Sequence, residues 1–223
     1  MKRKKTVILI ILAVIIAGLG ALIYWQWNNI EALRYFATYS EEERQNKLDE
    51  NEKAISDILD GMSGIDISRL SDEAVKMLQN GELTEEEAIA IITNKTTLDE
   101  IKSGKATLSN NSSNLETLIA KIYVLRSTYV GKLDSLVSQA YGEYKAGGDS
   151  DAIVDKYIGI ASGMEGECDG QIESLLSQIK TELEKTGGDM SLINQIRTTY
   201  KNEKSIKKGD LLSKYSNYKN KQK

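Results

Sequence analysis

Histidine and proline are absent from the 223 residues of this chain, which has one cysteine and one phenylalanine. Histidine is the usual general base near neutral pH and a common zinc ligand, so its absence excludes Ser-His-Asp and Cys-His arrangements. With Cys168 as the single thiol, the chain can form neither an ordinary zinc site nor an intrachain disulfide. We therefore expect no catalytic residue and no cofactor.

The scarcity of proline and aromatic residues favours helices over sheets, since Leu, Ile, Ala, Glu, Lys and Ser make up most of the chain. Apolar residues recur three or four positions apart over long stretches, the period of an amphipathic helix. The sequence therefore predicts an all-α protein.

The longest apolar run is TVILIILAVIIAGLGALIYW at positions 6–25, directly after MKRKK. About twenty apolar residues are enough to cross the hydrocarbon core of a bilayer. Basic residues precede the run and none follows it directly, which favours a cytoplasmic N-terminus and an extracytoplasmic body. We expect residues 1–27 to form a cytoplasmic basic tip and a single-pass transmembrane signal-anchor in the cell membrane. A cleaved secretory signal is the alternative, although its apolar region is usually shorter.

Three segments follow the anchor. Residues 28–62 are predicted to form a helical stalk, with a capping box at Ser40 and Glu43. Residues 63–104 are predicted to form a small helical unit whose short helices begin at Ser71, Thr84 and Thr97. Residues 105–113 are rich in Ser and Asn, as in a flexible linker, and we expect the domains to divide there.

The tripeptide Gly-Gly-Asp occurs twice, at Gly147, Gly148 and Asp149 and at Gly187, Gly188 and Asp189. Glycine just past a helix end accepts the left-handed conformation, and aspartate caps the helix that follows. Both tripeptides are therefore predicted to be turns between helices. Because short connections favour antiparallel neighbours, we expect residues 114–217 to form an antiparallel three-helix bundle of long helices, followed by a basic tail at 218–223.

The second predicted helix of this bundle contains GIASGMEGECDGQIE, in which four glycines are four, three and four positions apart. They are Gly159, Gly163, Gly166 and Gly170. Glycine costs a helix about 1 kcal/mol relative to alanine. The pattern predicts either the close approach of another helix or a hinge.

Three carboxylates in the same stretch, Glu165, Asp169 and Glu173, are four positions apart and form a row on one helix. Such a row is typical of a solvated helix face. The alternative is that the carboxylates bind a metal cation. A straight helix cannot wrap a cation, and calcium usually takes six or more oxygen ligands. Cys168 continues an apolar line and is predicted to be a small core residue.

Charge is unevenly distributed along the chain. The stretch from Gln26 to Ile196 has 16 basic and 31 acidic residues, whereas the stretch from Arg197 onward has nine basic and two acidic. A lysine-rich end suggests nucleic acid in a cytoplasmic protein, but the expected topology argues against that partner. Outside the membrane, the C-terminal lysines could meet an anionic envelope polymer or lipid head groups, and a solvated helix end is the alternative.

Three stretches, LRSTYVGKLDSLV (125–137), ASGMEGECDGQIESLL (161–176) and IRTTYKNEKSIKKGDLLSKY (196–215), resemble a group of uncharacterised single-pass, membrane-anchored helical proteins of Gram-positive bacteria. The resemblance covers mainly residues 115–215 and implies topology and helical character, with no activity attached.

The sequence as a whole predicts a binding or scaffolding component at the cell envelope that is not an enzyme. We expect a protein partner, or self-association through the helices. The alternative is a cation-binding sensor or an enzyme that uses the carboxylate row at Glu165, Asp169 and Glu173.

Overall fold

The computed structural model describes residues 31–60, 65–106 and 114–220. Within these ranges all regular structure is helical and there is no strand, which confirms the predicted all-α class. The chain divides into two compact units. Unit 1 joins the N-terminal part, as far as Asp57, to the C-terminal part from Gln195, and unit 2 holds the residues between them. The expected transmembrane anchor at 1–27 lies outside the described residues, as does most of the expected linker.

Three short helices open the described part of unit 2: α3 (Asp72–Asn80), α4 (Glu85–Ile92) and α5 (Leu98–Lys102). Their predicted N-caps are confirmed, since Ser71, Thr84 and Thr97 each accept a hydrogen bond from the backbone N–H three residues on. Thr84 and Thr97 also complete capping boxes with glutamates. These bonds satisfy N–H groups that a helix start leaves without partners.

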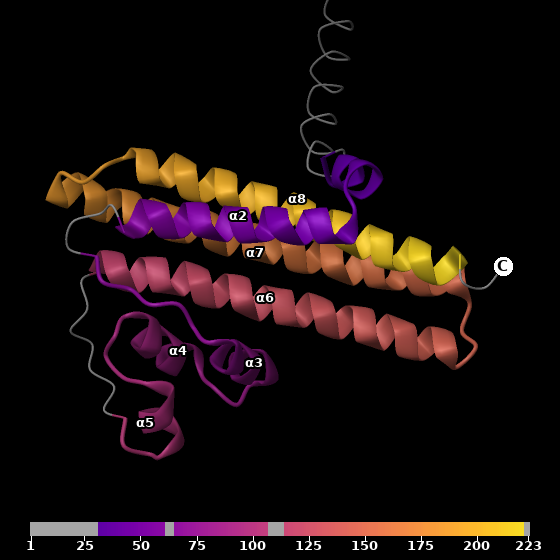
Figure 1. Cartoon of the computed structure of the whole chain (residues 1–223), viewed down its shortest axis with the longest axis horizontal. Coiled ribbons are helices and arrows are strands. Elements are labelled where there is room, and N and C mark those ends of the chain that lie inside the picture. Colours follow the sequence, from indigo (N-terminus) through magenta and orange to yellow (C-terminus); the bar gives the residue numbers. More distant parts are fainter. Residues whose placement is uncertain (1–30, 61–64, 107–113, 221–223) are drawn as a thin grey trace, which may run out of the picture. The chain divides into compact units, whose positions relative to one another are not determined.

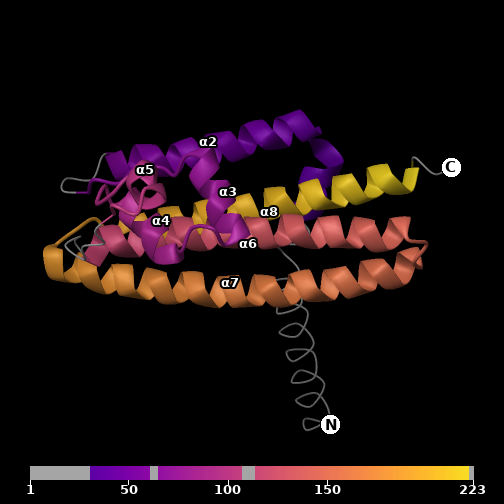
Figure 2. The same cartoon turned by 90° about the horizontal axis from the view of Figure 1, so that it is seen from below.

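The short helices do not form a domain of their own, because α3 and α4 pack on the long helix α6 (Asn114–Lys145) (Figures 1 and 2). The shared core consists of Ala74, Leu78, Leu83, Ala88, Ile92, Ala120 and Val124. Helices of 9, 8 and 5 residues are too short to be stable alone and need a larger apolar surface to cover. The predicted domain boundary between residues 63–104 and the long helices is therefore absent from unit 2.

Helix α6 and helix α7 (Ser150–Thr186) form an antiparallel pair joined by the first Gly-Gly-Asp turn (Figure 1). Gly147 has φ +87°, and the Gly148 N–H donates to the Glu143 carbonyl at 3.1 Å. Asp149 then accepts from the Ala152 N–H at 2.8 Å and caps α7. The predicted helix-to-helix turn is confirmed here.

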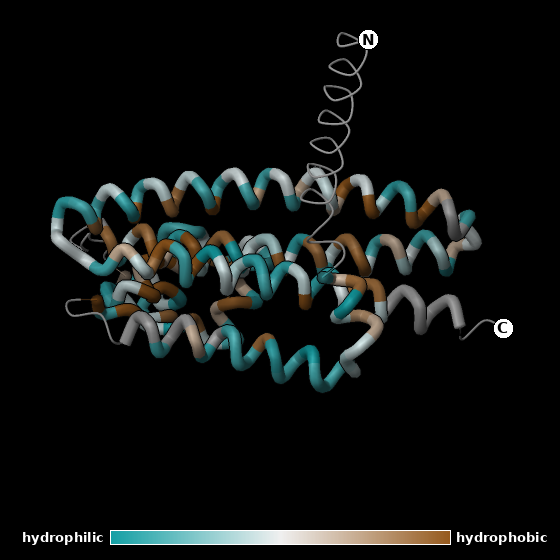
Figure 3. The backbone as a smooth tube through the Cα atoms, turned by 90° about the horizontal axis from the view of Figure 1, so that it is seen from above, coloured by the Kyte–Doolittle hydropathy of each residue, from teal (hydrophilic) through white to brown (hydrophobic). Residues whose placement is uncertain are grey.

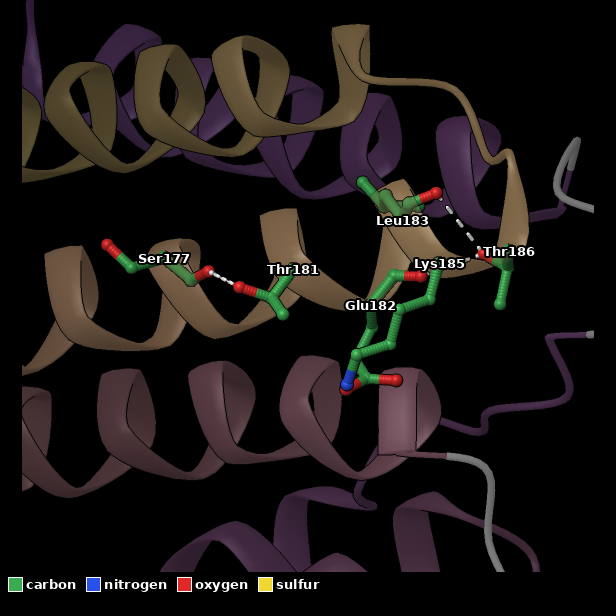
Figure 4. Close-up of polar contacts among 6 residues, drawn as sticks. All are labelled: Ser177, Thr181, Glu182, Leu183, Lys185 and Thr186. Atoms are coloured by element: carbon green, nitrogen blue, oxygen red, sulfur yellow. Dashed lines mark hydrogen bonds and ion pairs between the residues drawn. The ribbon is translucent and has the colours of Figure 1, made fainter.

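The C-terminal end of α7 uses side-chain hydroxyls as well as backbone groups (Figure 4). Thr186 donates to the carbonyl of Glu182 at 2.9 Å and lies 3.4 Å from that of Leu183. The Lys185 ammonium pairs with the Glu182 carboxylate at 2.8 Å. A basic residue in the last turn also complements the negative end of the helix dipole.

The second Gly-Gly-Asp turn follows directly. Gly187 has φ +67°, and the Gly188 N–H donates to the Leu183 carbonyl at 2.9 Å. Asp189 accepts from the Ser191 N–H at 2.8 Å and from its hydroxyl at 2.6 Å. Since α8 (Ser191–Asn220) begins at Ser191, this tripeptide also lies between two helices, and Asp189 bonds to the first residue of α8.

Unit 1 contains helical residues 31–38, helix α2 (Glu41–Asp60) and α8 from Gln195 onward. The predicted capping box before α2 is present, with Ser40 and Glu43 each accepting the other's backbone N–H. Helices α2 and α8 run antiparallel, because Arg44 pairs with Asp210 and Asn51 donates to the Thr199 carbonyl at 3.1 Å.

These pairings divide the chain differently from the predicted domains. The expected stalk, residues 28–62, contributes helices that pack within unit 1 on α8, with Leu48 buried among them. The expected domain at 114–217 is divided at Gln195, since α8 contacts α2 through residues far away in sequence. Figure 3 shows hydrophobic and hydrophilic positions alternating along the long helices, as expected for helices with one buried face.

Candidate interaction surfaces

A polar cluster connects α6 and α7 around Tyr129, with Glu167 and Gln171 exposed beside it. The Tyr129 side chain is buried, its hydroxyl lies 3.5 Å from the Glu167 carboxylate, and it accepts from the Gln171 amide at 3.3 Å. Burial, together with the nearby Cys168 and Glu167, raises the pKa of the Tyr129 hydroxyl. The hydroxyl is therefore protonated at neutral pH and serves as a hydrogen-bond donor between the two helices.

Cys168 is buried, with 5% of its surface exposed, and is not part of a disulfide. This confirms the prediction of a small core residue on α7. A nucleophilic cysteine needs a partly exposed site that favours the thiolate. Cys168 lacks that exposure.

The carboxylate row on α7 does not close around a common point. Glu165 and Asp169 are half-buried and Glu173 is exposed. Eight residues of helix separate the first carboxylate from the last, about 12 Å along the axis. Within residues 31–60, 65–106 and 114–220, no three His, Cys, Asp or Glu side chains gather to hold a metal ion. The cation-site alternative therefore has no geometric support in this part of the chain.

The four glycines of α7 lie on its solvent-facing side. Gly159, Gly163, Gly166 and Gly170 are all exposed, and a Cβ added at any of them would meet no heavy atom within 4 Å. Helical spacing places them about opposite Cys168 and the other core positions of α7. No segment of the described chain packs closely on them, so the close-packing prediction stays open for a partner molecule, and the hinge prediction is untested.

A basic face runs along α8 on the side that points away from its core. Buried positions such as Ile196, Thr199 and Ile206 line one side of the helix. The opposite side carries four basic residues that are four, three and four positions apart: Arg197, Lys201, Lys204 and Lys208. Of these, Lys201 is exposed and the other three are half-buried.

The acidic residues of α8 point the other way. Glu203 is 7% exposed, and Asp210 forms an ion pair with Arg44 of α2. These are the two acidic residues from Arg197 to the end of the chain. Because both are turned toward the core of unit 1, the surface of this part of α8 is more basic than its composition alone suggests.

The helix at 31–38 crosses α8 at Gly209 with backbone in close contact. A Cβ added at Gly209 would lie 2.9 Å from the Tyr35 Cβ and 3.0 Å from both the Ala32 carbonyl oxygen and the Phe36 nitrogen. Separations of this size are shorter than real Cβ contacts, so glycine is the residue that permits this crossing.

Two residues that hold the helices of unit 1 together, Arg44 and Gly209, could not be recognised from the sequence. Arg44 is 2% exposed although it lies in a highly charged segment, and Gly209 stands within a lysine-rich stretch. A glycine inside a predicted helix indicates a special position, but the sequence does not name its partner.

No protein-family model matches the chain, and no curated protein or solved structure matches it either. Among the described helices, none is both long enough and apolar enough to cross a bilayer.

Proposed function

We propose that this chain is a single-pass membrane protein whose body lies outside the cytoplasm, where it binds or scaffolds other components of the cell envelope without catalysis. The observation that carries the proposal is the apolar run at positions 6–25 behind MKRKK, with no basic cluster directly after Trp27. In this arrangement residues 1–27 are the transmembrane anchor and the helices from residue 31 onward form the extracytoplasmic body.

The absence of histidine from the whole sequence supports a binding role over catalysis. The buried thiol at Cys168 and the separated carboxylates of α7 point the same way. Scaffolding requires a surface that other molecules can use, and the proposed partner is a protein or a second copy of this chain that contacts the helices. The exposed surface of α7 supports this choice, because Ile158 and Ile160, on either side of Gly159 in the sequence, are 59% and 40% exposed.

The topology is tested by adding a protease to intact cells from which the wall has been removed, with an epitope tag placed before Met1. We expect the body to be digested while the tag and the anchor stay protected. Protection of the body until the cells are lysed would reverse the orientation and make the basic α8 cytoplasmic, where nucleic acid becomes a possible partner.

The scaffolding role is tested by crosslinking in intact membranes, followed by solubilisation and purification. We expect a specific crosslinked protein or a crosslinked dimer. Recovery of the monomer alone, under conditions that crosslink a known membrane complex, would contradict the scaffolding role and leave the topology unaffected.

A further inference from the structure

We infer that the basic face of α8 binds the anionic head groups of the membrane in which the chain is anchored. The basic face is defined by Arg197, Lys201, Lys204 and Lys208. The inference rests on the proposed membrane anchorage, and it selects one partner for the C-terminal lysines, a bilayer surface that contains anionic phospholipid.

The first step is the contact that ties α8 to the N-terminal region. Gly209 lies against the backbone of Ala32 and Phe36, and Ala32 is 2% exposed. Ala32 comes five positions after Trp27, where the expected span ends, and five positions reach at most about 18 Å even when fully extended. Chain connectivity therefore keeps Gly209 close to the membrane surface.

The second step is the direction of α8. Asp210 pairs with Arg44, and Thr199, about three turns earlier in α8, accepts from Asn51, about two turns later in α2. The part of α8 beyond Ile206 therefore lies beside the start of unit 1, which is the part nearest the anchor in sequence. The opposite direction would have placed this part of α8 away from the anchor.

The third step is the charge at this end. Lys207 and Lys208 immediately precede Gly209, and Lys204 lies about one turn earlier in α8. Glu203 and Asp210 are directed toward the core of unit 1. A juxtamembrane cluster of lysines is attracted to anionic lipid over roughly one Debye length, about 8–10 Å at physiological salt.

Lipid fits these observations better than a soluble envelope polymer. A soluble polymer can reach basic residues anywhere on the body, so its binding does not require them to lie near the membrane. Here Lys204, Lys207 and Lys208 lie within two turns of Gly209, at the end of unit 1 that the chain connects to the membrane, so lipid head groups are the nearest anionic groups. Each lysine near an anionic surface favours docking by about fivefold, and the attraction weakens as salt rises.

The test uses the full chain reconstituted into vesicles of phosphatidylcholine alone or of phosphatidylcholine with about a third phosphatidylglycerol. Flotation of the vesicles in high salt first measures whether the chain is anchored. Hydrogen–deuterium exchange of α8 is then compared between the two lipid compositions. We expect slower exchange over residues 201–213 in the anionic vesicles, and we expect high salt to abolish the difference.

Three variants make the measurement specific to the basic face. The double substitution Lys204→Gln with Lys208→Gln should lower the ratio of docked to free α8 by about 25-fold. Lys204→Arg with Lys208→Arg keeps the charge and should retain docking, which separates charge from packing. Lys180→Gln with Lys185→Gln removes two exposed lysines from α7 and should have no effect.

The outcomes separate this inference from the proposed function. A chain that does not float with the vesicles contradicts the anchorage, and the lipid contact with it. A chain that floats but shows equal exchange in both compositions overturns the lipid contact alone. Protection of α8 by soluble polyphosphate in phosphatidylcholine vesicles, without protection by phosphatidylglycerol, would assign the basic face to an anionic polymer instead.

Discussion

The Arg44 guanidinium in α2 lies 3.6 Å from the Asp210 carboxylate in α8, and the two side chains are only 3% and 17% exposed. Arg44 also donates to the Tyr39 carbonyl, while its Nε has no hydrogen-bond partner in the described structure. A buried pair of this kind adds little net stability, because desolvation offsets the attraction, but removing one member takes from the other the charge that compensates its burial. The pair therefore fixes how α2 and α8 align.

We predict that Arg44→Ala destabilises unit 1 by about 3 kcal/mol, the usual cost of leaving one member of a buried pair without its partner. The loss should appear as faster hydrogen exchange in α2 and α8, with little change in the α6–α7 pair. Replacing both Arg44 and Asp210 with Leu removes both charges and should recover most of the stability. Equal stability of Arg44→Ala and the unmodified chain would show that the pair is solvated and does not align the helices.

Gly209→Ala should also destabilise unit 1. Alanine is the better helix former by about 1 kcal/mol, but the added methyl group would lie 3.0 Å or less from the backbone and Cβ atoms of residues 31–38. Backbone cannot move aside as a flexible side chain can, so we expect a net destabilisation of about 1–3 kcal/mol.

The matched control for this prediction is Gly142→Ala in α6, where the added methyl group meets nothing within 4 Å. It should stabilise the chain by up to about 1 kcal/mol through helix propensity alone. Urea unfolding of both variants, followed by hydrogen exchange to locate the change, checks the pair. A Gly209→Ala variant that behaves like Gly142→Ala would mean that the 31–38 helix is not held against α8.

Local signals in the sequence were enough to predict the helices and their ends. The caps at Ser71, Thr84 and Thr97 and both Gly-Gly-Asp turns depend on residues within a few positions of each other, and each is present. The grouping of helices was not predictable in the same way. Apolar periodicity shows that α8 has a buried face but does not say which helix covers it.

The contacts that decide the grouping are between residues far apart in sequence. Arg44 and Asp210 are separated by most of the chain, and both belong to charged stretches that are typical of solvent-exposed helix. The small helical unit was assigned to a separate domain for a related reason. The polar stretch after Gly104 is typical of a domain boundary, although Ala120 and Val124 beyond it complete the core of α3 and α4.

The end of the α6–α7 pair next to the first Gly-Gly-Asp turn should be sensitive to acid. The pKa of the Glu143 carboxyl lies below the ordinary 4.5, because it accepts hydrogen bonds from Lys156 and from Tyr157. A carboxyl with a depressed folded-state pKa stabilises the fold above its unfolded-state pKa, and this contribution is lost as pH falls through the folded-state value. We therefore expect this contact to be intact above pH 4.5 and to weaken progressively below it.

The measurement is the melting temperature as a function of pH for the unmodified chain and for Glu143→Gln. The glutamine variant should show a smaller fall in melting temperature between about pH 5 and pH 3, since one protonation linked to folding has been removed. Glu184→Gln is a suitable control, because that glutamate lies on the same helix pair and its ion pair with Lys180, at 3.7 Å, is exposed. Parallel curves for Glu143→Gln and the unmodified chain would rule out the proposed contribution.

The glycines of α7 provide the last prediction, which connects stability to the proposed self-association. Nothing in the described chain lies within 4 Å of a Cβ at Gly163 or Gly166, so replacing both with alanine should stabilise the isolated chain by up to about 2 kcal/mol. The same methyl groups should weaken association if another helix approaches this face closely, because small residues are what allow two helix backbones to come near each other.

Thermal unfolding in detergent at low protein concentration measures the first effect, and sedimentation equilibrium over a range of concentrations measures the second. We expect a higher melting temperature together with a larger dissociation constant. Ser174→Ala, an exposed position on the same helix, adds no volume and should leave association unchanged. A double alanine variant that is more stable and associates as strongly as the unmodified chain would remove the glycine face from the interface. The hinge would then be the remaining explanation for four glycines in a helix that each of them weakens.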